Sequence, residues 1–308
     1  MKLIFLILSS VICCFCQENI LEICKFEDKL EKLKIINNVN GEERIQLSRR
    51  NPVYVKFDPY VQWIQNKKLF TLTIPRKPTT KPKFLELNLT GKIENPHYNT
   101  RHHDADKILI SNENEIFTIW TRKWNEIRTL QKIHTITNNL KIIQIKTYIR
   151  RIYFVTCDRK EKDICSIKSM TQEGQREIIL NPISIGKITS IGVHRNGLVF
   201  FSFKLNNENI IAYTDYKGSY VKYFSKFIDE CDVNNIDIGI VKKENIITWS
   251  CGNMVYSKQF KGNENFSYKV NDFKIIYKDQ RPNAQITSVS IVHQYNNMNG
   301  FYVFAIKI

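Results

Sequence analysis

A short apolar segment recurs six times along the chain, and its spacing limits the possible folds more than any single residue does. The segments are residues 69–72, 116–119, 152–155, 198–201, 246–249 and 301–304. They are rich in β-branched and aromatic residues, which favour strands. Successive segments begin roughly 36 to 55 residues apart, and a strand repeat of about 40 to 50 residues is typical of a β-propeller. The spacing predicts an all-β, six-bladed propeller; a β-sandwich with coincidental spacing is the alternative.

Two of the expected repeats, residues 142–180 and 188–224, can be aligned directly. Each begins with an apolar strand, passes through a tight turn into an aromatic second strand, and continues into a third strand. A turn containing Gly174 or Gly218 then leads to an edge strand. Four strands in succession are one propeller blade.

The N-terminus differs from the rest of the chain. Residues 1–16 combine Lys2, an apolar run and small residues at the end, as in a secretory signal peptide. We therefore expect a secreted, extracellular protein that begins at Gln17. Residues 17–49 carry apolar side chains at helical spacing, which predicts a short helical segment that packs on or closes the propeller of residues 50–308. Those apolar positions are Ile20, Ile23, Cys24, Leu30, Leu33 and Ile36.

The chain has 46 Lys and Arg against 30 Asp and Glu, a formal charge of +16. The basic residues are scattered, which argues against a nucleic-acid-binding tail. We expect a monomer with a basic surface. In a secreted protein such a surface attracts sulfated glycans, anionic cell surfaces or acidic host proteins. Alternatively, the lysines and arginines only keep a sheet-rich surface soluble.

Five cysteines follow the signal segment, and secretion permits disulfides. Cys157 and Cys165 flank a hairpin tip, and Cys231 and Cys251 could join a blade connection to the next blade's second strand. Cys24 is then left as a free or intermolecular thiol. No Cys-x-x-Cys or His-x-x-x-His spacing follows residue 16, so no metal site is expected. Two N-glycosylation acceptors are present, at Asn88 and Asn265.

Two stretches carry a family resemblance. Residues 68–76, ending in Pro75-Arg76, and the strand after Pro82 resemble the yellow/major royal jelly family, and residues 241–249 resemble its late-blade strand. Lys77 stands where that family usually has Trp. The segment 153–156 is also similar to the Tyr-Trp-Thr-Asp strand of lipoprotein-receptor-type propellers. The first resemblance implies a six-bladed propeller whose members sequester biogenic amines in the channel mouth, convert dopachrome, or serve as storage glycoproteins.

In a propeller the first strand of each blade lines the channel, so channel candidates lie where first strands begin. These are Thr189, Ser190, Asp237, Thr287 and Ser288. An aromatic amine needs an anion, polar groups and an aromatic face. Asp237 would take the cation, Thr189 and Thr287 the polar edge, and Trp249 or Phe201 the ring. The alternatives are that Trp249 and Phe201 belong to the core and that Asp237 is a surface or turn residue.

A second candidate is a polar loop spanning residues 96–106, with His97, His102, His103, Asp104 and Asp106. These could hold a metal or supply acid and base to a tautomerase-like reaction, but a solvated surface loop is the favoured interpretation. No nucleophile elbow, phosphate loop or dinucleotide motif is present, so no catalytic residue and no cofactor is assigned. The sequence favours a salivary or venom-type binding protein, with a glycan- or protein-binding surface and a melanin-pathway isomerase as alternatives.

Overall fold

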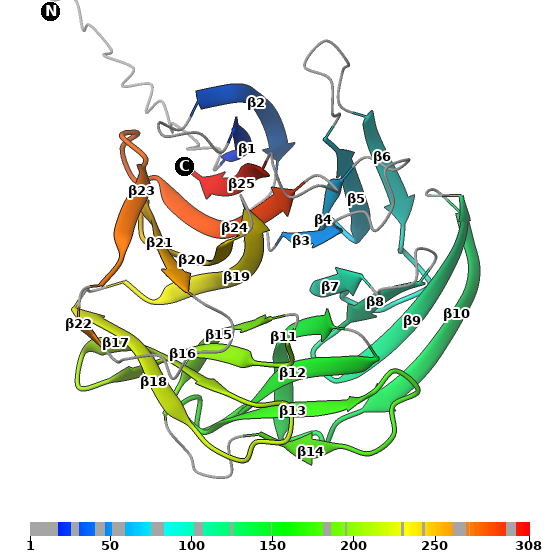
Figure 1. Cartoon of the computed structure of the whole chain (residues 1–308). Coiled ribbons are helices and arrows are strands. Elements are labelled where there is room, and N and C mark those ends of the chain that lie inside the picture. Colours follow the sequence, from blue (N-terminus) through cyan, green and yellow to red (C-terminus); the bar gives the residue numbers. More distant parts are fainter. Residues whose placement is uncertain are drawn as a thin grey trace, which may run out of the picture.

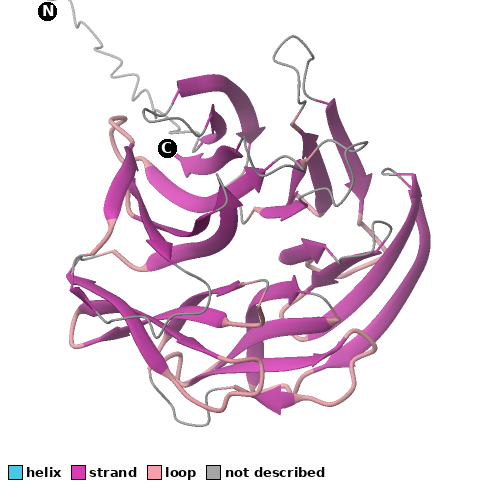
Figure 2. Ribbon diagram, viewed as in Figure 1, coloured by secondary structure: helices cyan, strands magenta, loops and turns pink. Residues whose placement is uncertain are grey.

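The computed structural model describes residues 18–25, 31–40, 47–50, 59–74, 83–101, 107–123, 126–148, 150–180, 186–194, 196–228, 231–241, 244–260, 269–270, 272–293 and 300–308. These residues form strands, turns and loops and include no helix (Figure 2). Within these ranges, accordingly, no helix has the length and apolarity needed to span a membrane. The predicted signal peptide lies outside them.

The strands form six antiparallel sheets, one of which gains a parallel fifth strand. From the innermost strand outward, they are β3 (Ser48–Arg50), β4 (Tyr60–Gln65), β5 (Lys68–Thr73), β6 (Lys83–Asn88); β7 (Tyr98–Arg101), β8 (Lys107–Ser111), β9 (Glu115–Lys123), β10 (Glu126–Thr135); β11 (Leu140–Tyr148), β12 (Arg151–Asp158), β13 (Cys165–Thr171), β14 (Ile178–Ile179); β15 (Ile188–Val193), β16 (Val199–Leu205), β17 (Glu208–Thr214), β18 (Lys222–Ile228), β22 (Lys269–Val270); β19 (Val233–Val241), β20 (Glu244–Cys251), β21 (Met254–Phe260), β23 (Lys274–Lys278); and β24 (Gln285–His293), β25 (Gly300–Lys307), β1 (Glu18–Lys25), β2 (Glu31–Asn40).

The innermost strands β3, β7, β11, β15, β19 and β24 surround a central channel (Figure 1). Each contacts the next, and β24 contacts β3, so the ring is closed. Five sheets use strands that follow one another along the chain, apart from β22, which joins β18. The remaining sheet combines both ends of the described chain. The all-β propeller prediction is confirmed.

The predicted N-terminal helix is wrong, because residues 18–25 and 31–40 are strands. β1 pairs antiparallel with β25, and β2 pairs with β1. The C-terminal sheet has only two strands of its own, β24 and β25, and it would otherwise expose the backbone of β25 as an unpaired edge. Pairing with β25 therefore favours a strand here more strongly than the spacing of the apolar residues favours a helix.

A buried group of polar side chains holds β1 in place. The phenol of Tyr277 donates a hydrogen bond to Glu22 Oε2 (2.7 Å), and Arg281 Nη2 donates to Glu22 Oε1 (2.7 Å). Arg281 Nε also donates to Asp279 Oδ1 (2.9 Å). We call Glu22, Tyr277, Asp279 and Arg281 the closure cluster. It connects the N-terminal strand to the segment leading into β24 and so helps close the ring.

The repeated apolar segments do not occupy equivalent strands throughout. Four mark the second strand of a sheet, whereas residues 69–72 and 116–119 lie in the third strands β5 and β9. The true second strands there are β4, whose apolar run is interrupted by buried Gln62, and the five-residue β8. Residues 116–119 lie in a third strand and residues 152–155 in the second strand of the next sheet, so the interval between these two segments is the shortest.

Both predicted disulfides are present. Cys157 on β12 bonds to Cys165 on β13, and Cys231, before β19, bonds to Cys251 at the end of β20. The first fixes one hairpin, and the second fixes the entry into a new sheet, as the cysteine spacing predicted. Asn88 ends β6 and is exposed, whereas Asn265 lies outside the described residues.

Candidate functional site

Four innermost strands carry a β-bulge at the same place near their beginning. The register shifts fall between Ile142 and Gln144, Ile188 and Ser190, Val233 and Asn235, and Ile286 and Ser288. The extra residue is Ile143, Thr189, Asn234 or Thr287. A bulge re-aims side chains relative to regular pairing. All four extra residues line a single cavity, so the repeated irregularity builds a site at one end of the channel.

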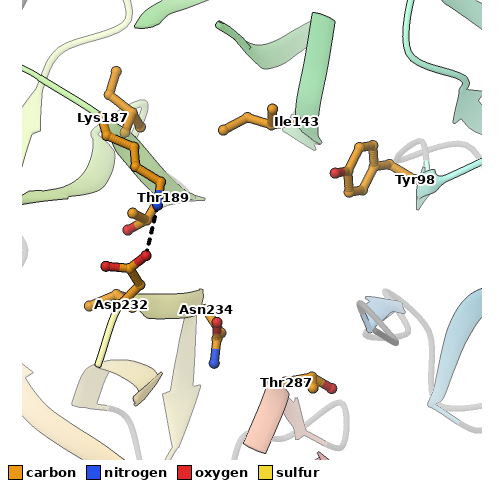
Figure 3. Close-up of a pocket in the computed structure, with 9 residues that line it drawn as sticks. Tyr98, Ile143, Lys187, Thr189, Asp232, Asn234 and Thr287 are labelled. Carbon is orange, nitrogen blue, oxygen red and sulfur yellow. Dashed lines mark hydrogen bonds and ion pairs between the residues drawn. The ribbon is translucent and has the colours of Figure 1, made fainter. Parts of the chain in front are cut away.

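The cavity encloses about 240 Å³, and we call it the channel cavity. Tyr98 from β7 contributes to its wall, as do Lys187 and Asp232, which directly precede β15 and β19 (Figure 3). Ile188 and Val233 complete the lining. Five innermost strands or their entry loops therefore meet here, which is where a propeller can assemble a ligand site from separate repeats.

A charged group lies at the cavity wall. Lys187 Nζ is 2.8 Å from Asp232 Oδ2, and Lys204 Nζ is 3.6 Å from Asp232 Oδ1. Burial raises the pKa of Asp232, but the hydrogen bonds and charges of the two lysines outweigh burial and hold that pKa below its ordinary value. Asp232 is therefore ionised at neutral pH. All three side chains keep contact with solvent.

Two further polar side chains, Asn234 and Thr287, line the cavity (Figure 3). The Thr287 hydroxyl donates to the Ala305 carbonyl (3.3 Å), and Asn234 Nδ2 donates to the Ile286 carbonyl (3.2 Å). These bonds engage donors of both side chains, while a hydroxyl and an amide each also carry acceptor oxygens. Together with Asp232, they give the cavity a wall suited to a ligand that donates hydrogen bonds.

Tyr98 and Ile143 form a less polar part of the cavity. Burial, with the nearby charge of Glu113, raises the pKa of Tyr98 to about 12. The phenol therefore stays neutral at physiological pH. Its ring lies across the cavity from Lys187 and Asp232, and the aliphatic side chain of Ile143 lies between Lys187 and Tyr98 in the view of Figure 3.

Of the sequence-predicted ligand residues, the structure places Thr189 and Thr287 in the cavity. Asp237 lies further along β19, and its carboxylate accepts a hydrogen bond from the Ile291 backbone (2.7 Å). Trp249 and Phe201 are fully buried in separate apolar clusters. Trp249 stacks on Tyr256 with ring centroids 5.8 Å apart. Neither aromatic residue lines the channel cavity.

The residue after each bulge joins neighbouring innermost strands. Gln144 Oε1 accepts from the Ile191 backbone N–H (2.6 Å), and Ser190 Oγ accepts from that of Ile236 (2.8 Å). Asn235 Nδ2 donates to the Val289 carbonyl (2.6 Å), and Ser288 Oγ accepts from the Leu47 N–H (2.9 Å). Ser190 and Ser288 were predicted to line the channel, but their hydroxyls serve these junctions between strands.

Sequence reasoning missed Tyr98, Ile143, Lys187, Asp232 and Asn234. For the bulge residues Ile143 and Asn234 a usable signal was present, because each bulge follows Ile or Val and precedes Gln, Ser or Asn. The four segments are Ile142–Ile145, Ile188–Ile191, Val233–Ile236 and Ile286–Val289. Aligning the repeats on this pattern, instead of on the second strand, would have placed the four bulge residues side by side.

The predicted loop at residues 96–106 is partly wrong, because Tyr98–Arg101 is the innermost strand β7. That strand pairs with β8, and its inner position gives Tyr98 access to the cavity. His97 is exposed, and His102, His103, Asp104 and Asp106 lie outside the described residues. Elsewhere in the described chain, His, Cys, Asp and Glu side chains form no group of three that could hold a metal.

Comparison with known proteins supports the fold. No family model matches the sequence, and no curated protein matches it. A chain in the crystal structure of a nidogen/laminin complex is similar, with a TM-score of 0.54 and 10% sequence identity. The match covers 79% of this chain and 92% of that chain. At this identity the similarity concerns the fold alone, and the class it supports is the β-propeller.

Proposed function

We propose that this protein is a secreted binding protein that holds a small ligand in the channel cavity. The observation that carries the proposal is the convergence of four bulge residues on one cavity beside an ionised carboxylate. The two disulfides suit an oxidising, extracellular compartment. Removal of residues 1–16 is part of the proposal, and peptide mass spectrometry of the exported protein should then find Gln17, as glutamine or pyroglutamate, at the N-terminus.

A biogenic amine is the proposed ligand class. In this hypothesis Asp232 takes the ammonium group in place of a lysine, Asn234 and Thr287 accept hydrogen bonds, and the aromatic ring lies against Tyr98 and Ile143. Asp232 thus takes the role that sequence reasoning gave to Asp237. The resemblance to the yellow/major royal jelly family supports this choice but stays a hypothesis, as does the isomerase alternative that depends on His102 and His103.

Calorimetric titration with serotonin, histamine, noradrenaline and dopamine tests the proposal. We expect one-to-one binding by at least one amine, weakened about ten- to a hundredfold in Asp232→Asn because a charge-assisted hydrogen bond is lost. Asp163→Asn, an exposed aspartate on a hairpin tip, removes the same charge as a control. Flat traces for all four amines, or equal weakening in both variants, would contradict amine binding at this site.

A second candidate function is supported by the net charge of +16. A basic propeller can bind an anionic glycan or a protein through its outer surface and leave the channel with a structural role only. Such binding should weaken steeply as salt is added, whereas binding inside the cavity should depend on salt much less.

A further inference from the structure

A tyrosine- and lysine-rich hairpin lies at the end of the propeller opposite the channel cavity. On the cavity side, Ile188 at the start of β15 pairs with Phe203. At the other end of the same sheet, Val193 pairs with Val199, which pairs with Thr214. The chain then turns and returns as β18. Residues 215–223 are therefore separated from the channel cavity by the length of the sheet.

This hairpin exposes aromatic and cationic side chains together. Tyr216 and Tyr220 are 43% and 37% exposed. Lys217 Nζ lies 5.5 Å from the centre of the Tyr216 ring, and Lys222 Nζ lies 5.3 Å from that of Tyr220. We call Tyr216, Lys217, Tyr220 and Lys222 the tyrosine–lysine surface. Large exposed side chains grouped in this way, and not scattered singly, indicate an interaction site.

The turn beneath this surface is held in one conformation. Asp215 Oδ1 accepts hydrogen bonds from the backbone N–H groups of Lys217 (3.1 Å) and Ser219 (2.8 Å). Gly218 has a φ of +73° and sits so close to Leu180 that an added Cβ would lie 2.8 Å from the Leu180 Cα. The aromatic rings are thus presented by a turn that requires little ordering on binding.

Charge at this end of the molecule favours an anionic partner. The carboxylate of Asp215 is engaged by turn amides, while the ammonium groups of Lys217 and Lys222 extend over exposed rings. Exposed Arg150 occupies the β11–β12 turn at the same end of its sheet. An acidic peptide would use only the lysine ammonium groups of this surface, and a neutral sugar would use only its tyrosine rings. The presence of both features favours a ligand that carries both sugar rings and negative charge.

We propose that the tyrosine–lysine surface binds a sulfated glycan chain. The apolar faces of sugar rings stack on the tyrosines, and sulfate groups pair with Lys217 and Lys222. This inference gives the second candidate function a location and a partner class, and it is independent of the channel cavity. Binding here and binding of a small ligand in the cavity can both occur.

Heparin-affinity measurements test this assignment in the full mature chain. We expect wild-type binding that weakens with salt. Affinity should fall about five- to tenfold in Lys217→Gln/Lys222→Gln, in which two charge contacts are lost, and by a similar factor in Tyr216→Ala/Tyr220→Ala, which keeps every charge. Lys160→Gln/Lys162→Gln removes the same charge from an exposed hairpin tip at the cavity end and should change affinity little.

Equal losses in both lysine variants would show binding by net charge alone and overturn the proposal. Unchanged affinity in the tyrosine variant, together with equally tight binding of polyglutamate, would also overturn it and indicate an acidic polypeptide as the partner. Because both lysines are exposed, we expect their substitution to leave folding unchanged. The comparison of the two lysine variants therefore still tests the proposal if the tyrosine variant folds poorly. Amine titration of the same variants separates this outcome from failure of the cavity proposal.

Discussion

Two groups of carboxylates and cations lie in this propeller, and they differ in burial. In the closure cluster, the side chains of Glu22 and Asp279 are 1% and 2% exposed, and Arg281 bonds to both. In the channel cavity, Asp232 is 39% exposed and Lys187 is 48% exposed. Both groups hold a carboxylate in its ionised form, but only the second leaves that carboxylate accessible to a ligand.

The difference indicates separate roles for similar chemistry. A buried carboxylate depends on its partners, because removing one partner leaves an uncompensated charge away from water. A half-exposed ion pair adds little stability, because water and salt compete with it. The closure cluster therefore suits a role in holding the ring together, whereas the exposure of the Lys187–Asp232 pair supports the proposal that it contacts a ligand.

The largest effect is expected from Glu22→Ala. This substitution removes the charge-assisted hydrogen bonds that Arg281 and Tyr277 donate to Glu22 and leaves Asp279 as their shared buried acceptor, so the free energy of unfolding should fall by about 3–5 kcal/mol. Urea denaturation followed by tryptophan fluorescence measures the change. Glu113→Ala is the matched control, since Glu113 forms an exposed ion pair with Arg159 at 2.8 Å and its loss should cost less than about 1 kcal/mol. Equal losses would remove the distinction between the two groups.

The dependence of stability on acidic pH should also distinguish the closure cluster from the Lys187–Asp232 pair. Burial raises the pKa of Asp279, but hydrogen bonds from Arg281 outweigh burial and hold it below its ordinary value. The folded protein therefore binds fewer protons here than the unfolded chain does. The stability from Asp279 is present above the unfolded pKa of about 3.9 and is lost as pH falls through the lower folded value.

Urea unfolding of the wild type and Asp279→Asn, measured at a series of pH values in high salt, checks this expectation. The wild type should lose stability below about pH 4, and the variant should show a flatter curve there. Asp232→Asn should retain the wild-type slope because salt screens an exposed pair. Parallel curves for the wild type and Asp279→Asn would contradict a role for this carboxylate in acid stability.

The contrast also shows what could be predicted from the sequence. The strand repeat, the disulfides and the channel position of Thr189 and Thr287 follow from local patterns. The closure cluster does not, because Glu22 and Arg281 are far apart in sequence and meet only when β1 joins β25. The N-terminal helix was predicted wrongly for the same reason: pairing with a distant strand decided the conformation. Asp232 was missed since loop residues before a strand carry no periodic signal.

A smaller effect on stability is expected from Asp232→Asn. The unfolding free energy should change by less than about 1 kcal/mol, and less in high than in low salt, because its partners are exposed. Thermal unfolding in both buffers measures this. The same variant should bind the amine more weakly, so function and stability separate at this residue. A loss as large as that of Glu22→Ala would instead make Asp232 a structural residue.

A comparably small effect on stability is expected from Thr189→Val, and its neighbour Ser190 supplies the contrast. The bulge directs Thr189 to the cavity and Ser190 to the junction between strands. Thr189→Val keeps the side-chain shape but removes a hydrogen bond with Ser202 (2.8 Å), so we expect a loss of about 0.5–1.5 kcal/mol and weaker ligand binding.

Ser190→Ala leaves the buried N–H of Ile236 without its acceptor and should cost about 1–3 kcal/mol. Urea denaturation and amine titration of both variants measure these effects. If Ser190→Ala impaired binding more than stability, and Thr189→Val did the reverse, the bulge would direct the opposite residue toward the ligand.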